Sequence, residues 1–433
     1  MSNPNQLLQA LASGQHDDAL AALYALDGTK ESLDRARTRA QHVVQSFVSS
    51  FAPASEADAA LFSGPGRTEI GGNHTDHQHG HVLCGSVDLD MLACAAPNGT
   101  GVIRIQSEGY PALEISLDSL SARKEEENTS AALVRGVAAK VTELGFTLGG
   151  FDAYVTSNVL SGSGLSSSAA YEVLIGNILN HFFCRGELDP IQIAKIGQYA
   201  ENVYFGKPCG LMDQMGSSVG GAVAIDFADP SAPVVEKAGY DFTKSGHALC
   251  IVDTCSSHGD LTGDYADITL EMGAIAAHFG QKFLRDVPEA DFRASLPTLR
   301  TQYGDRAVLR AMHYYDDDRR AVEEAKALEA EDFDGFLRLI NESGLSSALH
   351  LQNTWSIADP KQQAIPVVLA IGRELLEGTG AIRVHGGGFA GTIQAFVPNE
   401  KLPAFKAGME QLLGEGKCHI LHIRPQGGCV VIP

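Results

Sequence analysis

The chain has 433 residues, with 32 Lys and Arg against 53 Asp and Glu, so its formal net charge is −21. This balance argues against nucleic acid or an anionic membrane as the main partner, because both attract basic surfaces. A hydrophobic content of 44% is typical of a globular protein, and the length predicts two domains. No apolar run reaches the ~18 residues of a membrane helix, and the first residues lack the basic and apolar parts of a signal peptide, so we expect a cytoplasmic location.

The pattern of elements predicts an α+β fold in both halves of the chain. Residues 1–35 contain two short helical patterns, which we interpret as an N-terminal helical appendage. Residues 36–240 and 241–433 are expected to form the two domains. The expected helices lie at 34–51, 129–144, from the loop near 165, from 190, and near 264–280, 305–328, 332–348 and 401–414. The expected strands lie at 81–97, 100–107, 112–117, 151–159, 248–255, 380–389, 392–398 and 419–425.

A glycine-serine loop, SGSGLSSSAA, follows a predicted strand and opens a predicted helix. Glycine leaves the backbone N–H groups unobstructed, and N–H groups at a helix start converge on an anion. A nucleotide phosphate is the expected occupant. The loop is neither a Walker A sequence, because no GK[ST] follows, nor a GxGxxG dinucleotide fingerprint. The residues expected to bind ATP are Gly162, Ser163, Gly164, Leu165, Ser166, Ser167 and Ser168.

Four motifs occur in the order in which one kinase family has them. PGRTEIGGNHTDHQHG resembles the galactokinase signature PGRVNLIGEHTDYNGG, and SGSGLSSSAA resembles the loop PxGxGLSSSAA of the GHMP kinases. ENVYFGKPCGLMDQMGSSVGG is similar to EHxFxGxPCGIMDQ, and RVHGGGFAGTIQAF is similar to RMTGGGFGGC. The chain is therefore identified as a member of the galactokinase family from about residue 40 onward. The resemblance implies a two-domain GHMP kinase fold with a ferredoxin-like C-terminal domain and an active site between the domains.

The resemblance also implies which residues serve phosphoryl transfer. Asp213 is expected to be the base or orienting acceptor for the anomeric hydroxyl of D-galactose, and Arg67 to stabilise negative charge beside it. Ser168 and Glu201 match the family's magnesium ligands, and Mg²⁺ prefers such oxygen donors. ATP and Mg²⁺ are thus the expected cofactors. The third motif would let the backbone approach the active site through Gly386, Gly387 and Gly388.

By the same resemblance, the sugar site is expected to contain His74, Asp76, Gly210 and Tyr265. One position departs from the family: where the family has a glutamate that accepts a bond from the sugar's terminal hydroxyl, this chain has Asn73. Asn73 is nevertheless expected to bind the sugar, because an amide could still hold the terminal CH2OH and would also tolerate a carboxylate at C6. HTDHQHG further resembles the HxDHQ motif of uronate kinases. Galacturonate therefore stays open as an alternative substrate, as does a galactose and ATP sensor without turnover.

Two features bear on metals and partners. His77, His79 and His81 would share one face of a strand, an arrangement that could bind zinc, with a polar surface as the alternative. The eight cysteines include no CxxC pair, and most of them are expected to be reduced and buried. The expected partners are the sugar and ATP, and the expected state is a monomer or a weak homodimer.

Overall fold

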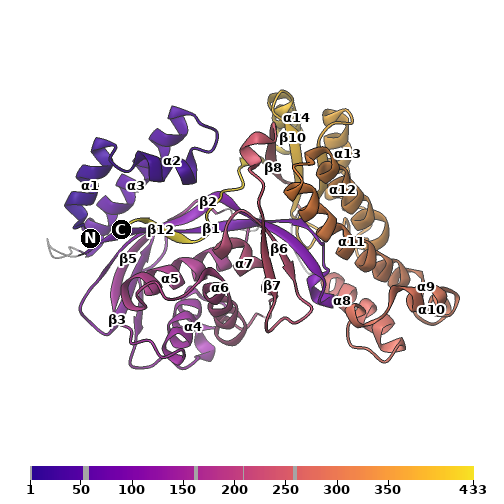
Figure 1. The fold of residues 1–433 in the computed structure, drawn as a ribbon, viewed down its shortest axis with the longest axis horizontal. Helices are drawn as coiled ribbons and strands as arrows, with labels where there is room; N and C mark the ends of the chain where they lie inside the picture. The colour runs from indigo at the N-terminus through magenta and orange to yellow at the C-terminus, as the bar shows by residue number, and fades with distance from the viewer. Residues whose placement is uncertain (1, 52–57, 160–163, 208, 257–260) are drawn as a thin grey trace.

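The computed structural model describes residues 2–51, 58–159, 164–207, 209–256 and 261–433. Within these residues the strands form an eight-stranded and a four-stranded sheet (Figure 1). The α+β expectation is confirmed. None of the helices in these ranges combines the length and the apolarity that crossing a membrane requires.

The larger sheet has the order β12-β1-β2-β5-β3-β4, and β6 and β7 extend it from β2. Neighbouring strands are antiparallel except for the parallel pair of β3 and β5. The strands are β1 (Ala60–Gly71), β2 (His81–Pro97), β3 (Val102–Ser107), β4 (Leu113–Ser116), β5 (Phe151–Ser157), β6 (Ala222–Asp226), β7 (Val234–Ala238) and β12 (Cys429–Ile432).

Helices cover both faces of this sheet, as Figure 1 shows. Successive residues of a strand point to opposite faces, so Phe62 packs towards one helical layer and Leu61 towards the other. The first layer contains α4 (Ser130–Glu143), α5 (Ser167–Phe183), α6 (Pro190–Tyr199) and α7 (Met212–Val219). The second contains α1 (Pro4–Ser13), α2 (Asp17–Tyr24) and α3 (Lys30–Phe51). The N-terminal helices therefore complete a core, which their interpretation as an appendage did not predict.

The smaller sheet has the order β11-β8-β10-β9 and is antiparallel throughout. Its strands are β8 (His247–Asp253), β9 (Ala381–Val384), β10 (Thr392–Pro398) and β11 (Cys418–Leu421), and α13 (Ala364–Leu376) and α14 (Leu402–Leu413) pack on one face. The other helices of this half are α8 (Thr262–His278), α9 (Glu289–Ala294), α10 (Leu296–Tyr303), α11 (Asp305–Glu329) and α12 (Phe333–Ser346). Leu249 and Ile251 of the other face join one apolar cluster with Ile70 and Leu83 of the larger sheet. The two halves are thus packed on a shared core.

Two strands differ from the expectation. The last strand, β12, returns to pair with β1, so residues 429–432 complete the sheet of the first half rather than that of 241–433. Strand β1 was not among the expected strands, and it contains Gly64, Pro65 and Gly66, residue types that are disfavoured within a strand. Gly64 is required because a Cβ there would overlap the carbonyl oxygen of Ala170 in α5. The close packing of α5 on β1 therefore explains why the strand contains Gly64, a residue type that is unfavourable within strands.

A buried carboxylate links the N-terminal helices to this sheet. Asp90 is fully buried and accepts hydrogen bonds from Tyr24 (2.7 Å), Arg39 (2.5 Å) and Ser63. Arg424 lies 3.5 Å away on its other side. Burial opposes ionisation, but the two arginines outweigh it and lower the pKa of Asp90.

We expect Asp90→Asn to lower the free energy of unfolding by about 3–5 kcal/mol, because it leaves the fully buried Arg424 and the largely buried Arg39 without a counter-ion. The half-exposed ion pair of Asp34 with Arg37 provides the control, and Asp34→Asn should lose less than about 1 kcal/mol. Urea unfolding measures both variants. Equal losses for the two would contradict the assignment of Asp90 as the anchor.

Candidate active site

The structure brings Arg67 and Asp213 into direct contact although 146 residues separate them in the chain. Arg67 lies on β1, and its Nε and Nη2 donate to Asp213 Oδ1 at 2.8 and 2.5 Å. Asp213 lies in the first turn of α7, with 29% of its side chain exposed. Burial opposes its ionisation, but the charge of Arg67 and hydrogen bonds from Ser166 and Arg67 lower the pKa of Asp213. The group is therefore a carboxylate near neutral pH.

Arg67 also holds the start of the glycine-serine loop. Its Nη1 donates to the carbonyl oxygen of Gly164, and its backbone N–H donates to that of Leu165 at 3.0 Å. Ser166 has a φ of +55° and caps α5, which begins at Ser167. Gly162 and Ser163 lie outside the described residues. The described part of the expected phosphate loop thus joins the Arg67–Asp213 pair at a helix N-terminus, where backbone N–H groups favour an anion.

The two expected magnesium ligands are neighbours. Ser168 Oγ lies 3.1 Å from Glu201 Oε1. Glu201 is buried in a π-helix at Ala200–Phe205 that continues α6, and Gln214 donates to its other oxygen at 2.8 Å. Lys207 lies 3.6 Å from Glu201. A hydroxyl and a carboxylate side by side are oxygen donors of the kind that Mg²⁺ prefers, so these residues fit the ion.

The third motif forms a turn between β9 and β10 that contacts the expected sugar residues. His74 donates from Nε2 to the carbonyl oxygen of Gly387 at 3.0 Å. Tyr265 donates its phenolic proton to the carbonyl oxygen of Gly388 at 2.9 Å, whereas we had expected it to donate to the sugar. A Cβ on Gly387 would press on the Tyr265 ring, so glycine is needed there.

His74 is a neutral acceptor in this arrangement. Burial and the neighbouring His77 lower the pKa of His74 to about 4. Because Nε2 carries the proton donated to Gly387, Nδ1 of the neutral ring has a lone pair for a hydroxyl donor. Asp76 and Gly210, two further residues expected in the sugar site, are neighbours. A Cβ built on Gly210 would lie only 2.9 Å from Asp76 Oδ2.

Asn73 has a different environment from the one expected. It is fully buried, and its Nδ2 donates to Glu69 Oε1 at 2.9 Å and to the carbonyl oxygen of Gly386 at 2.7 Å. Its Oδ1 accepts from Ser347 at 3.2 Å and from Asn353 at 2.8 Å. These four bonds use the whole capacity of the amide, so the geometry gives no direct contact between Asn73 and a sugar.

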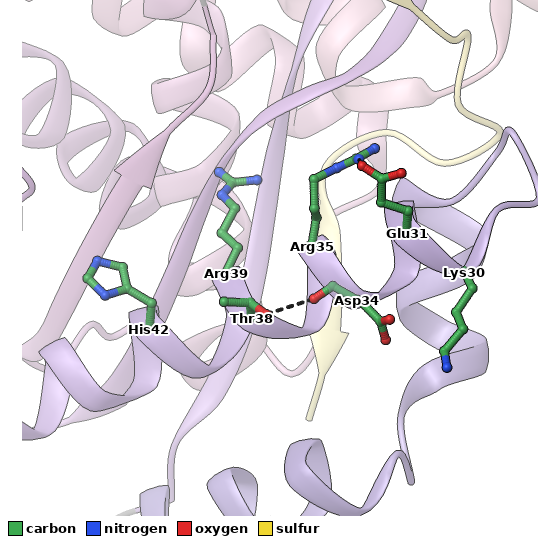
Figure 2. A pocket seen from close by; sticks show the side chains of 7 residues that line it. All are labelled: Lys30, Glu31, Asp34, Arg35, Thr38, Arg39 and His42. Carbon is green, nitrogen blue, oxygen red and sulfur yellow. Dashed lines mark hydrogen bonds and ion pairs between the residues drawn. The ribbon is translucent and has the colours of Figure 1, made fainter.

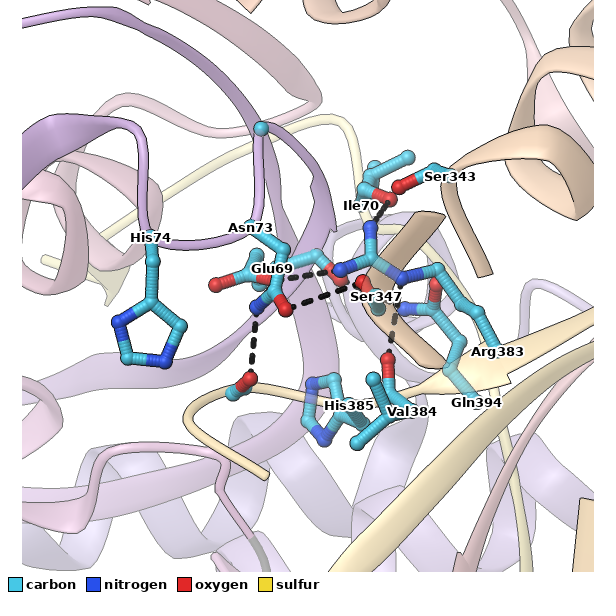
Figure 3. Close-up of polar contacts among 12 residues, drawn as sticks. Glu69, Ile70, Asn73, His74, Ser343, Ser347, Arg383, Val384, His385 and Gln394 are labelled. Atoms are coloured by element: carbon cyan, nitrogen blue, oxygen red, sulfur yellow. Dashed lines mark hydrogen bonds and ion pairs between the residues drawn. The ribbon is translucent and has the colours of Figure 1, made fainter. Parts of the chain in front are cut away.

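The sequence reasoning missed a buried ionic cluster behind this amide, shown in Figure 3. Arg383 on β9 is fully buried and donates to Glu69 Oε1 at 2.7 Å. Burial raises the pKa of Glu69, and the charge of Arg383 opposes the rise. Glu324 on α11 lies against Gly71, and among the residues that the structure describes neither of its carboxyl oxygens has a hydrogen-bond partner. The sequence did offer one sign of this cluster, because Glu69 lies inside the first motif, PGRTEIGGNHTDHQHG.

The expected alternation of histidines along a strand is wrong. A short 3₁₀ turn at Asp76–Gln78 intervenes, and β2 begins only at His81. His79 stacks on Phe283 with ring centroids 3.6 Å apart, whereas His81 contacts Asp318 at 3.0 Å. The described residues contain no group of three His, Cys, Asp or Glu side chains that could hold a metal ion. All eight cysteines are free, and five of them are buried, as expected.

A cavity of about 790 Å³ lies elsewhere, along the exposed side of α3 (Figure 2). Both arginines that line it already have acidic partners, since Arg35 pairs with Glu31 and Arg39 with Asp90. None of the expected catalytic or sugar residues lines it. The cavity therefore does not compete with the cluster around Arg67 as the active site.

Comparisons with known proteins identify the family. Residues 45–97 match the family model of the galactokinase galactose-binding signature, and residues 132–221 match that of the GHMP kinases N terminal domain. A galactokinase from Streptomyces coelicolor is 30% identical over 353 residues, which cover 81% of this chain and 87% of that protein. The chain belongs to the galactokinase family. It is accordingly a sugar kinase, a phosphotransferase of the GHMP kinase superfamily.

Solved structures show that other galactokinases and GHMP kinases share the fold. The crystal structure of Lactococcus lactis galactokinase complexed with galactose superposes with a TM-score of 0.74 at 21% identity, covering 89% of this chain and 98% of that one. The Methanococcus jannaschii mevalonate kinase superposes with a TM-score of 0.60 at 15% identity, covering 86% and 99%. The predicted GHMP kinase fold is confirmed.

The buried carboxyl of Glu324 is expected to make the stability of this galactokinase family member depend on pH. Burial raises the pKa of Glu324 well above its ordinary value of 4.5. A raised carboxyl pKa contributes stability that is fully present below the unfolded-state value and is lost as pH rises towards the folded-state value.

We therefore expect Glu324→Gln, which cannot ionise, to gain thermal stability relative to the parent protein as pH rises. Melting temperatures of the two proteins should differ little at pH 4.5, and the difference should grow in favour of the variant towards pH 8. Calorimetry at several pH values measures it. A difference independent of pH would show that Glu324 does not carry the buried proton.

Proposed function

We propose that this protein transfers the γ-phosphoryl group of ATP to the anomeric C1 hydroxyl of D-galactose, giving galactose 1-phosphate and ADP. The observation that carries the proposal is the double contact of Arg67, which binds Asp213 and the phosphate loop at Gly164 together. In-line transfer requires a held nucleophile next to neutralised phosphate charge, and this arrangement supplies both.

Asp213 would accept the hydrogen bond of the C1 hydroxyl and orient it towards the γ-phosphate. A carboxylate with a lowered pKa is a weak base, so orientation comes first and proton transfer follows late, when the hydroxyl has become acidic. Arg67 would stabilise the developing charge, since a guanidinium remains protonated and donates several hydrogen bonds. Both roles are consistent with a loose transition state that needs little covalent help.

Ser168 and Glu201 would hold Mg²⁺, which supplies charge neutralisation to the phosphate oxygens when bound. Gln214 keeps the Glu201 carboxylate in place through its 2.8 Å hydrogen bond. The neighbouring Glu172 also accepts from Gln214, at 3.0 Å, and burial together with the charge of Glu201 raises the pKa of Glu172. Protonation of Glu172 would leave Glu201 as the charged oxygen ligand.

The sugar would be bound by His74, Asp76, Gly210 and Tyr265. His74 Nδ1 and the Asp76 carboxylate are acceptors for hydroxyl groups, and Gly210 offers a backbone N–H. Buried polar groups of this kind reject sugars that lack the matching hydroxyl, because the group would be left unpaired. We further propose a monomer or a weak homodimer as the working state, which sedimentation can measure.

A panel of sugars with ATP tests the substrate. We expect ADP release with galactose well above that with glucose or galacturonate. Turnover of galacturonate but not galactose would make the protein a uronate kinase. Sugar binding without ADP release would make it a sensor instead.

We expect Asp213→Asn to lower kcat by roughly 100-fold or more while sugar binding is largely kept, because the amide retains the shape but not the charge of the acceptor. Steady-state kinetics and calorimetric galactose binding measure the two effects. Unchanged kcat would remove Asp213 from the mechanism.

We expect Ser168→Ala to raise the Mg²⁺ concentration for half-maximal rate by roughly 10-fold or more, because one oxygen donor is lost. Ser49→Ala, at an exposed serine of α3 that bonds to Gln45 of its own helix, is the control, and it should keep the magnesium dependence of the parent. Equal dependence in all three proteins would contradict the assignment of Ser168 as a ligand.

A further inference from the structure

Strand β1 places a second carboxyl group in line with the catalytic pair. Arg67 and Glu69 are two residues apart on a stretch paired in unbroken register with β2, from Arg67 opposite Ser86 to Glu69 opposite Cys84. Residues i and i+2 of a strand share a face and lie about 6.6 Å apart. Glu69 interacts electrostatically with both Arg67 and Asp76. Its carboxyl group therefore belongs to the same site as Asp213 and the sugar residues.

One oxygen of Glu69 is occupied and the other is not. Oε1 accepts from Arg383 at 2.7 Å and from Asn73 at 2.9 Å, which fixes the orientation of the carboxyl group. Oε2 accepts no hydrogen bond from any of the residues that the structure describes. It is nevertheless not one of the fully buried polar atoms that lack a partner, so it keeps some accessible surface. In Figure 3 the Glu69 carboxyl group lies between Asn73 and Arg383, and His74 lies on the side away from Arg383.

The side chain of Glu69 is slightly exposed to solvent, unlike those of its partners Asn73 and Arg383. Asn73 and Arg383 are fully buried, whereas 6% of the Glu69 side chain and 16% of the Asp76 side chain remain exposed. The Glu69 side chain thus keeps a small accessible surface, whereas the Asn73 amide has none. Aligned with the signature PGRVNLIGEHTD, the chain has Glu69 where that signature has Asn, and Asn73 where it has Glu. The two side chains are exchanged.

We propose that Glu69 Oε2 accepts a hydrogen bond from a sugar hydroxyl on the edge of the ring opposite the anomeric carbon, which makes Glu69 a specificity-determining residue. This inference rests on the proposed sugar 1-kinase function. With the C1 hydroxyl at Asp213, the opposite edge of the pyranose ring, which carries the C4 and C6 hydroxyls, would be directed towards Glu69. Asn73 and Arg383 position the carboxylate from behind.

The chemistry of this acceptor selects among sugars. A carboxylate accepts but does not donate, so it favours a hydroxyl, leaves a deoxy sugar without a partner for the buried oxygen, and repels the carboxylate of a uronate. The galacturonate alternative, which Asn73 suggested, is disfavoured because Glu69 supplies the negative charge that Asn73 lacks.

The test compares kcat/KM for galactose, 4-deoxygalactose, 6-deoxygalactose and galacturonate in the parent protein, Glu69→Gln and Glu69→Asp. In the parent, we expect galactose to exceed one of the two deoxy sugars by roughly 10- to 100-fold. In Glu69→Gln, galactose should lose roughly that factor, mainly through KM, and the preference over that deoxy sugar should shrink to within about threefold. Glu69→Asp keeps the charge beside Arg383 but withdraws the oxygen by one methylene, so it should lose the same preference.

Glu324→Gln is the matched control, because it changes a buried carboxyl of the same cluster that faces Gly71 rather than the sugar site. It should keep the parent's sugar preference. Parent selectivity retained in folded Glu69→Gln and Glu69→Asp would overturn the assignment of Glu69, as would a parent protein that uses both deoxy sugars as well as galactose. A parent protein with no turnover of any sugar would instead overturn the proposed function.

Discussion

The guanidinium of Arg67 is the interaction on which the active site depends. It joins strand β1, the start of helix α5 and the first turn of helix α7 through its bonds to Asp213 and to the carbonyl oxygen of Gly164. A buried cation requires such a partner, and its planar fork of donors fixes the direction of each bond. The acceptor for the sugar hydroxyl and the phosphate loop are therefore held relative to each other before any ligand binds.

A second polar cluster fixes the sugar loop across the junction of the two halves. The backbone of Asn73 is bound by Asp317 and His313 of α11, each at 2.9 Å, while its side chain bonds the third motif at Gly386. Arg383 adds bonds to Glu69 and to the carbonyl oxygen of Ile70. Because leaving a buried amide or charge without a partner costs free energy, these hydrogen bonds set the positions of the segments together. Residues that touch no sugar in our proposal thus determine where His74 and Glu69 lie.

Much of the fold was predictable because most elements have a clear hydrophobic period. Helix α11 and strand β10 were found nearly at their observed bounds. Strand β1 was not, since Gly64 and Pro65 interrupt its pattern for a reason that lies in α5. The role of the N-terminal helices was also missed, because nothing in residues 1–35 shows that the second face of a sheet needs covering. The histidines failed as a strand pattern because a 3₁₀ turn separates them from β2.

The sequence alone determined the family, the candidate catalytic pair and the candidate metal ligands, since these depend on residue types at short, fixed spacings within four motifs. The tertiary structure decided how the polar groups of the sugar site are used. Asn73 and Glu69 are four residues apart in one motif, and either could have faced a sugar. Their difference arises from Ser347, Asn353, Gly386 and Arg383, which come from distant segments and saturate the amide while leaving one carboxyl oxygen free. Hydrogen-bond capacity is a local property, but which partners use it is settled only when the chain is folded.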